Sequence, residues 1–153
     1  MVGLKRCIVA LLSVVYVTLT THIVDAANNF CATALNKPVC ENMVKGSANW
    51  DEAITKAITA AMTEVAKASK SGHPECKQAY KDTESDMKES MEAVSSGSKR
   101  SLNIKLSAAL TSLEDCTNVL KELKQDVAAA TTLNDGVDQA IRACLAVDKS
   151  KTP

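Results

Sequence analysis

The sequence predicts an all-α protein, built as an up-down-up-down four-helix bundle. Glycine, proline and aromatic residues are scarce, whereas alanine, lysine, glutamate, leucine and methionine, which are good helix formers, are abundant. Four long segments repeat apolar residues at alternating steps of three and four, the spacing that places them on one face of a helix. The short connection between the second and third segments favours antiparallel neighbours, and hence a bundle.

Residues 1–26 are predicted to be a secretory signal peptide. The basic pair Lys5-Arg6 precedes an apolar run from Cys7 to Leu19, which is shorter than the roughly 20 residues that a membrane span needs. Small residues at the −3 and −1 positions predict cleavage after Ala26, with cleavage after Ala27 as the alternative. The protein is therefore expected to be secreted, and Cys7 to leave with the signal.

Residues 27–153 are predicted to form one domain, with an N-terminal extension over 27–46 and the bundle over 47–149. Removing the signal takes away one net positive charge, so the neutral precursor yields a domain with one net negative charge. Such a surface lacks the basic face that nucleic-acid binding requires. Because there is neither a second long apolar segment nor a C-terminal anchor signal, we expect no membrane anchor.

The first bundle helix is expected between Asn49 and Gly72. Asn49 and Glu52 have the spacing of a capping box, which satisfies free N–H groups of the first helical turn. Ser71 and Gly72 form a typical helix end. The predicted inward face comprises Trp50, Ile54, Ile58, Ala61, Val65 and Ala68.

The second helix is expected to begin at Pro74, because proline is favoured at the first helical position. It should end before the polar turn of residues 95–98. The predicted inward face comprises Cys76, Tyr80, Thr83, Met87, Met91 and Val94.

The third and fourth helices follow this turn. The third has the most regular apolar face, which comprises Leu102, Leu106, Ala109, Leu113, Cys116, Leu120 and Leu123. The fourth is expected to begin at a cap formed by Thr132 and Asp135, although Gly136 just behind it costs about 1 kcal/mol relative to alanine. Its predicted inward face comprises Leu133, Val137, Ala140, Ile141, Cys144 and Val147.

The cysteines of an exported protein are expected to form disulfides rather than to bind a metal. Cys76 and Cys116 lie equally far on either side of the turn near residue 96, so an antiparallel hairpin brings them to the same height. Both point inward, which predicts a disulfide that contributes about 4 kcal/mol in the chain-entropy model. Cys144 is left over and is expected to be a buried free thiol; a reactive thiol or an intermolecular bridge is the alternative.

The sequence contains no recognisable catalytic constellation. His73 is the only histidine of residues 27–153, and its place before Pro74 predicts a helix cap. One histidine supplies neither a histidine-rich zinc site nor a Ser-His-Asp triad. Glu114 and Asp115 are neighbours on a helix and so diverge, whereas the two carboxylates of a glycosidase face one bond. We therefore expect a binding protein with no catalytic residue, metal or cofactor.

Three motifs together resemble the plant invertase and pectin methylesterase inhibitor family. Cys31, followed after eight residues by Cys40, resembles the staple of the family's N-terminal hairpin. Cys76-x3-Tyr80 at the start of a helix resembles its third-cysteine motif. The segment Leu-Ser-Ala-Ala-Leu at 106–110, followed by Cys116, resembles its fourth-cysteine motif. The resemblance covers the signal peptide and essentially all of the mature chain.

Three positions depart from the family pattern. Leu120 stands where an aromatic residue usually follows the fourth cysteine, and Thr83 and Met87 replace an alanine and a leucine. All three belong to predicted inward faces, so they affect packing detail more than fold.

The resemblance implies a helical hairpin before the bundle and disulfides Cys31–Cys40 and Cys76–Cys116. It also implies a protein of the plant apoplast and cell wall that docks one-to-one over the active-site cleft of a carbohydrate enzyme. Pectin methylesterase is the preferred target on family frequency, and invertase is the alternative. The exposed polar positions Lys81 and Glu84 are candidate interface residues.

A carrier of a small apolar ligand is the alternative from a different functional class. The cysteine pattern lacks the closely spaced pairs of familiar secreted helical carriers. The apolar faces also have no surplus of large residues to line a cavity between the helices. Both observations favour the inhibitor.

Overall fold

The computed structural model describes residues 29–125 and 128–151, so the predicted signal peptide and its cleavage site lie outside the described residues. Within these ranges the chain is helical and contains no strand, which confirms the predicted fold class. The elements are α2 (Lys37–Met43), α3 (Trp50–Ser71), the 3-10 turn η1 (Pro74–Cys76), α4 (Lys77–Ser95), α5 (Lys99–Glu122) and α6 (Ala128–Ser150).

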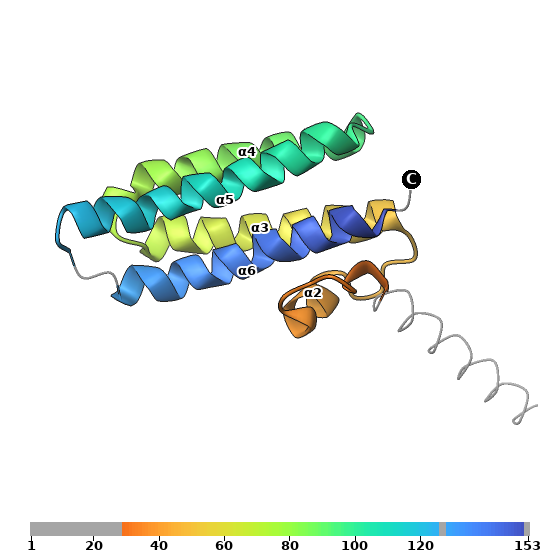
Figure 1. Cartoon of the computed structure of the whole chain (residues 1–153), viewed down its shortest axis with the longest axis horizontal. Coiled ribbons are helices and arrows are strands. Elements are labelled where there is room, and N and C mark those ends of the chain that lie inside the picture. The colour runs from red at the N-terminus through yellow and green to blue at the C-terminus, as the bar shows by residue number, and fades with distance from the viewer. Residues whose placement is uncertain (1–28, 126–127, 152–153) are drawn as a thin grey trace, which may run out of the picture.

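Helices α3 to α6 form the predicted four-helix bundle (Figure 1). The closest pairs are α4 with α5 and α3 with α6, and contacts of α3 with α4 and of α5 with α6 close the ring. Helix α2 lies outside the bundle and packs on α6 and α3, on the side away from α4 and α5 (Figure 1). The N-terminal extension therefore adds a second layer to one face of the bundle.

The start of α3 has the predicted cap, with one change in its partners. The Asn49 side chain accepts a hydrogen bond from the backbone N–H of Glu52 at 2.9 Å. The Glu52 carboxylate accepts from the backbone N–H of Ala48 at 2.9 Å, one residue earlier than in a standard capping box. The Asn49 side chain thus satisfies a free N–H group of the first turn, and the Glu52 side chain holds the segment just before the helix.

Gly72 ends α3, but for a different reason from the one its sequence position suggests. Its φ is −78°, so no left-handed conformation requires glycine there. Instead, a Cβ at this position would lie 2.5 Å from Cε2 of Tyr80 and 2.5 Å from the carbonyl oxygen of Ala68. Glycine is needed because the Tyr80 ring packs directly against the backbone.

Two features of the second helix differ from the prediction. Pro74 begins the 3-10 turn η1, and α4 itself starts at Lys77. Near its C-terminal end, Ser90 and Ala93 are the buried residues, while Met91 and Val94 are only half buried.

Ser90 can occupy a buried position because its hydroxyl donates to the carbonyl oxygen of Asp86 at 2.8 Å. Burying a hydroxyl group costs little free energy when the group has a hydrogen-bond partner. Thr83, one of the departures from the family pattern, is satisfied in the same way by the carbonyl oxygen of Ala79 at 2.8 Å. The other two departures, Met87 and Leu120, are fully buried.

The predicted inward face of the third helix is buried from Leu102 to Leu120, as expected. The prediction for Leu123 was wrong, because this side chain is 50% exposed. Helix α5 ends at Glu122, and Lys124 adopts a positive φ of 54°, which turns the chain out of the helix.

The predicted start of the fourth helix was also wrong. Residue 128 is already helical, so Thr132 and Asp135 lie inside α6 rather than at its cap. The run of alanines at 128–130 favours helix more strongly than a later cap can stop it. Val137, Ala140, Ile141, Cys144 and Val147 are buried as predicted, and Leu133 is half buried.

Two glycine substitutions should change stability in opposite directions. Gly72→Ala should lower the free energy of unfolding by about 1–3 kcal/mol, because the new methyl overlaps Tyr80. Gly136→Ala should raise it by about 0.4–1 kcal/mol, because position 136 is helical and its Cβ would meet only a Glu64 oxygen at 3.9 Å. Urea unfolding of both variants measures the two values, and equal effects would contradict the packing around Tyr80.

Candidate docking surface

Two disulfides fix the framework that any docking surface must rest on. Cys31–Cys40 joins the segment before α2 to the middle of that helix, and Cys76–Cys116 joins η1 to α5. All four cysteines are buried. The disulfides therefore hold the extension and the α4/α5 pair from inside, without occupying the surface.

A buried polar cluster surrounds the second disulfide. The Tyr80 hydroxyl donates to Oδ1 of Asn134 at 3.0 Å, and Nδ2 of Asn134 donates to Sγ of Cys116 at 3.1 Å. Burial raises the pKa of Tyr80, so its hydroxyl keeps the proton that it donates. This cluster ties α4, α5 and α6 together at one end of the bundle. Asn134 was not predicted as part of this cluster, because a single polar residue inside an amphipathic helix carries no specific sequence signal.

Side-chain contacts also connect the helices at the opposite end of the bundle. Nε1 of Trp50 donates to the carbonyl oxygen of Val147 at 2.8 Å, which joins the start of α3 to the end of α6. Nζ of Lys151 lies 3.8 Å from the centroid of the Trp50 ring. Nδ2 of Asn103 on α5 donates to Oδ2 of the buried Asp148 at 3.0 Å. With both ends fixed, the helical faces between them form a rigid frame.

The candidate interface residues Lys81 and Glu84 both lie on α4. Lys81 is exposed, and the half-exposed Glu84 forms an ion pair with Lys88 at 2.6 Å. Lys81, Glu84, Lys88 and Met91 follow one another at helical spacing, so they share one stripe of α4. We call these four residues the α4 stripe.

The α4 stripe leads into a groove between α3 and α4. The groove has a volume of about 760 Å³ and is lined by Thr59, Met62, Lys88, Met91, Glu92, Ser95 and Ser96. Met62 and Met91 are half buried and belong to the part of the surface packed against the core. Two flexible apolar side chains are thus bordered by charged residues, an arrangement typical of protein interfaces.

The α4/α5 face is different, because it carries an internal network of charges. Nζ of Lys105 lies 2.5 Å from Glu89 and 3.8 Å from Asp86, and Ser112 donates to Asp86 at 3.1 Å. The hydrogen bond to Glu89 raises the pKa of Lys105. These groups already satisfy one another across two helices, so a partner would have to displace them.

The residues that were considered as catalytic candidates are a helix cap and two exposed helix residues. Nδ1 of His73 accepts a hydrogen bond from the backbone N–H of Glu75 at 3.3 Å, so His73 caps η1 as predicted. Glu114 and Asp115 are exposed on α5. Over residues 29–125 and 128–151, no three histidine, cysteine, aspartate or glutamate side chains gather in a way that could hold a metal ion.

Cys144 is a buried free thiol in the described part of the chain. Burial raises its pKa, so the thiol stays protonated and unreactive at neutral pH.

None of the helices in the described ranges has the length and apolar character to span a membrane.

Comparison with known proteins gives one family and one fold. Residues 25–147 match the family described as plant invertase/pectin methylesterase inhibitor. A mutant form of a pectin methylesterase inhibitor from Arabidopsis has a TM-score of 0.67 at 18% sequence identity, over 83% of this chain and 97% of that one. A second pectin methylesterase inhibitor from Arabidopsis thaliana has a TM-score of 0.58 at 17% identity, over 82% and 95%. No curated protein matches the chain.

The disulfide pairing can be tested on protein that has folded under oxidising conditions. Peptide mapping without reduction should give the links 31–40 and 76–116, with Cys144 alkylated only after unfolding. Replacing Cys76 and Cys116 by alanine should lower the free energy of unfolding by about 4 kcal/mol, because the disulfide closes a long loop. Cys144→Ala is the control and should lower the free energy of unfolding by less. A Cys76–Cys144 or Cys31–Cys116 link would contradict the arrangement of the helices.

Proposed function

The chain belongs to the plant invertase/pectin methylesterase inhibitor family, and on this basis we propose that it is a secreted protein inhibitor of pectin methylesterase. The family match over residues 25–147 is the observation that carries the proposal. We prefer pectin methylesterase because the two solved structures compared above, which have a similar fold, are inhibitors of that enzyme. Invertase is the alternative target within the family.

Inhibition is proposed to occur by one-to-one docking over the enzyme's active-site cleft, without chemistry by the inhibitor. A stable complex of this kind buries roughly 800 Å² on each partner. Binding loses less free energy to ordering when the docking face is already rigid. The two disulfides and the tied ends of the bundle supply this rigidity.

The α4 stripe and the adjoining groove are our candidates for the docking face. Met62 and Met91 offer apolar area that can adapt to a partner, and Lys81, Glu84 and Glu92 supply a charged border. Lys105 on the α4/α5 face is paired with carboxylates, whereas Lys81 has no ion-pair partner among the described residues. Its ammonium group is therefore available to a carboxylate of the enzyme.

Secretion is part of the proposal. The predicted signal peptide directs the chain to the exterior, and disulfides such as those of this chain persist in oxidising compartments. The proposed place of action is the apoplast and cell wall, where pectin is found.

Parallel titrations against a plant pectin methylesterase and an acid invertase test the function. The mature protein should inhibit the first enzyme towards one-to-one stoichiometry, co-elute with it on gel filtration, and turn over neither pectin nor sucrose. Charge reversal by Lys81→Glu or Glu84→Lys should raise the inhibition constant about two- to fivefold, because each group lies at an exposed border. Asp115→Lys on α5 is the matched control and should have no effect.

Two results would count against these proposals. Absence of inhibition of both enzymes, from mildly acidic to neutral pH, would contradict the inhibitory function. Equal weakening by Lys81→Glu and Asp115→Lys would instead leave the function in place and remove the α4 stripe as its docking face.

A further inference from the structure

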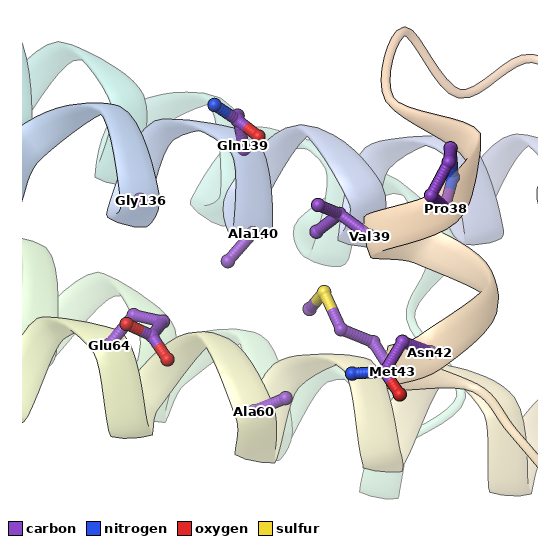
Figure 2. A pocket seen from close by; sticks show the side chains of 9 residues that line it. All are labelled: Pro38, Val39, Asn42, Met43, Ala60, Glu64, Gly136, Gln139 and Ala140. Atoms are coloured by element: carbon purple, nitrogen blue, oxygen red, sulfur yellow. The ribbon is translucent and has the colours of Figure 1, made fainter.

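A second groove lies outside the bundle core, between α2 and the α3/α6 pair (Figure 2). It has a volume of about 640 Å³, within the range of roughly 300–1,000 Å³ that is usual for small-molecule sites. The lining residues are Pro38, Val39, Asn42, Met43, Ala60, Glu64, Gly136, Gln139 and Ala140. Because α2 packs on the side of the bundle away from α4, this groove is separate from the proposed docking face (Figure 1).

The groove is hollow because small residues face one another on α3 and α6. Ala60 comes from α3, while Gly136 and Ala140 come from α6, so these three positions leave space between the two helices. The longer side chains of Glu64 on α3 and Gln139 on α6 also line the groove. Val39 and Met43 point towards this space from α2 (Figure 2). The lining is thus mixed: five side chains are apolar, one residue is glycine, and Asn42, Glu64 and Gln139 are polar.

Helix α2 is held in place over the groove. The Cys31–Cys40 disulfide fixes it to the segment that precedes it. Nδ2 of Asn36, the residue that caps α2, donates to Oε1 of Gln139 on α6 at 2.7 Å. The groove therefore exists before any ligand arrives, which reduces the free-energy cost of binding.

Glu64 places a carboxylate group at one end of the groove. Its Oε1 accepts from Nζ of Lys67 at 2.7 Å, on the same helix. Its Oε2 lies 3.9 Å from the position that a Cβ on Gly136 would take, so this oxygen faces α6 across the groove. Within the described part of the chain, no group donates a hydrogen bond to Oε2. One carboxylate oxygen is thus free to accept from a ligand.

We propose that this groove binds a small cationic amphiphile, with an apolar chain along Val39, Met43 and Ala140 and a protonated amine at Glu64. Burial of an alkyl chain is favourable by about 0.8 kcal/mol for each methylene removed from water. The amine would donate to Oε2 of Glu64, and such a charge-assisted hydrogen bond is stronger than a neutral one. An apolar molecule with a carboxylate head has no proton to donate to Oε2, so it cannot form this hydrogen bond. This binding site goes beyond the proposed inhibition of an enzyme.

Two ligands with the same chain and opposite head groups test the proposal. The mature protein is titrated with n-octylamine and with octanoate, both below their aggregation concentrations, by calorimetry and by NMR of the methionine methyl groups. One octylamine should bind per chain and shift the Met43 methyl signal, and octanoate should bind at least tenfold more weakly. Neither measurement includes an enzyme, so failure here leaves the inhibitory function untouched.

Three variants identify the groups responsible. Glu64→Gln keeps the shape of the side chain and should weaken octylamine binding about tenfold, because it removes a charged hydrogen-bond acceptor. Ala60→Leu should abolish binding of both ligands by filling the groove. Glu89→Gln is the matched control, since Glu89 is also paired with a lysine but lies on α4, and it should change nothing.

Several outcomes would overturn the proposal. These are no saturable binding, equal affinity for the two head groups, an unchanged Met43 signal, or equal effects of Glu64→Gln and Glu89→Gln. Loss of a dimer in Ala60→Leu on analytical ultracentrifugation would assign the groove to a second copy of the chain. Weaker enzyme inhibition by a folded Ala60→Leu variant would assign it to the enzyme.

Discussion

The Cys76–Cys116 disulfide is the constraint on which the rest of the structure depends. It joins the turn before α4 to α5 and so fixes the register of the closest helical pair in the bundle. Tyr80 and Asn134 are hydrogen-bonded beside it and bring α6 to the same point. Gly72 leaves room for the Tyr80 ring at the end of α3. All four bundle helices therefore meet around one buried covalent bond.

Much of this fold could be predicted from periodicity alone, because a helix that buries one face must repeat apolar residues every three or four positions. The inward face of α5 from Leu102 to Leu120 is an example. The errors lie at helix ends, where local conformation decides. Leu123 has the apolar spacing of a core residue, but α5 ends at Glu122 and the Leu123 side chain is 50% exposed. The alanines at 128–130 start α6 earlier than its expected cap.

The functional surfaces could be predicted less well, for a physical reason. A docking face is defined by its partner, so Lys81 and Glu84 could be chosen only for exposure, and they remain predictions. The α2 groove depends on tertiary placement, since it brings Ala60 and Glu64 opposite Gly136 from a distant part of the sequence. No local sequence pattern predicts such a groove, because small residues also occur where two helices simply pack together.

Hydrogen–deuterium exchange of residues 27–153, with and without pectin methylesterase, tests the central claim most directly, because it reports both complex formation and its location. A rigid bundle that docks through its outer face should show slower exchange over the facing parts of α3 and α4, around Met62 and the α4 stripe. Exchange in α2 should stay unchanged. Protection confined to α2, or to α5 and α6, would contradict the proposed docking face, and no protection with either pectin methylesterase or invertase would contradict docking itself.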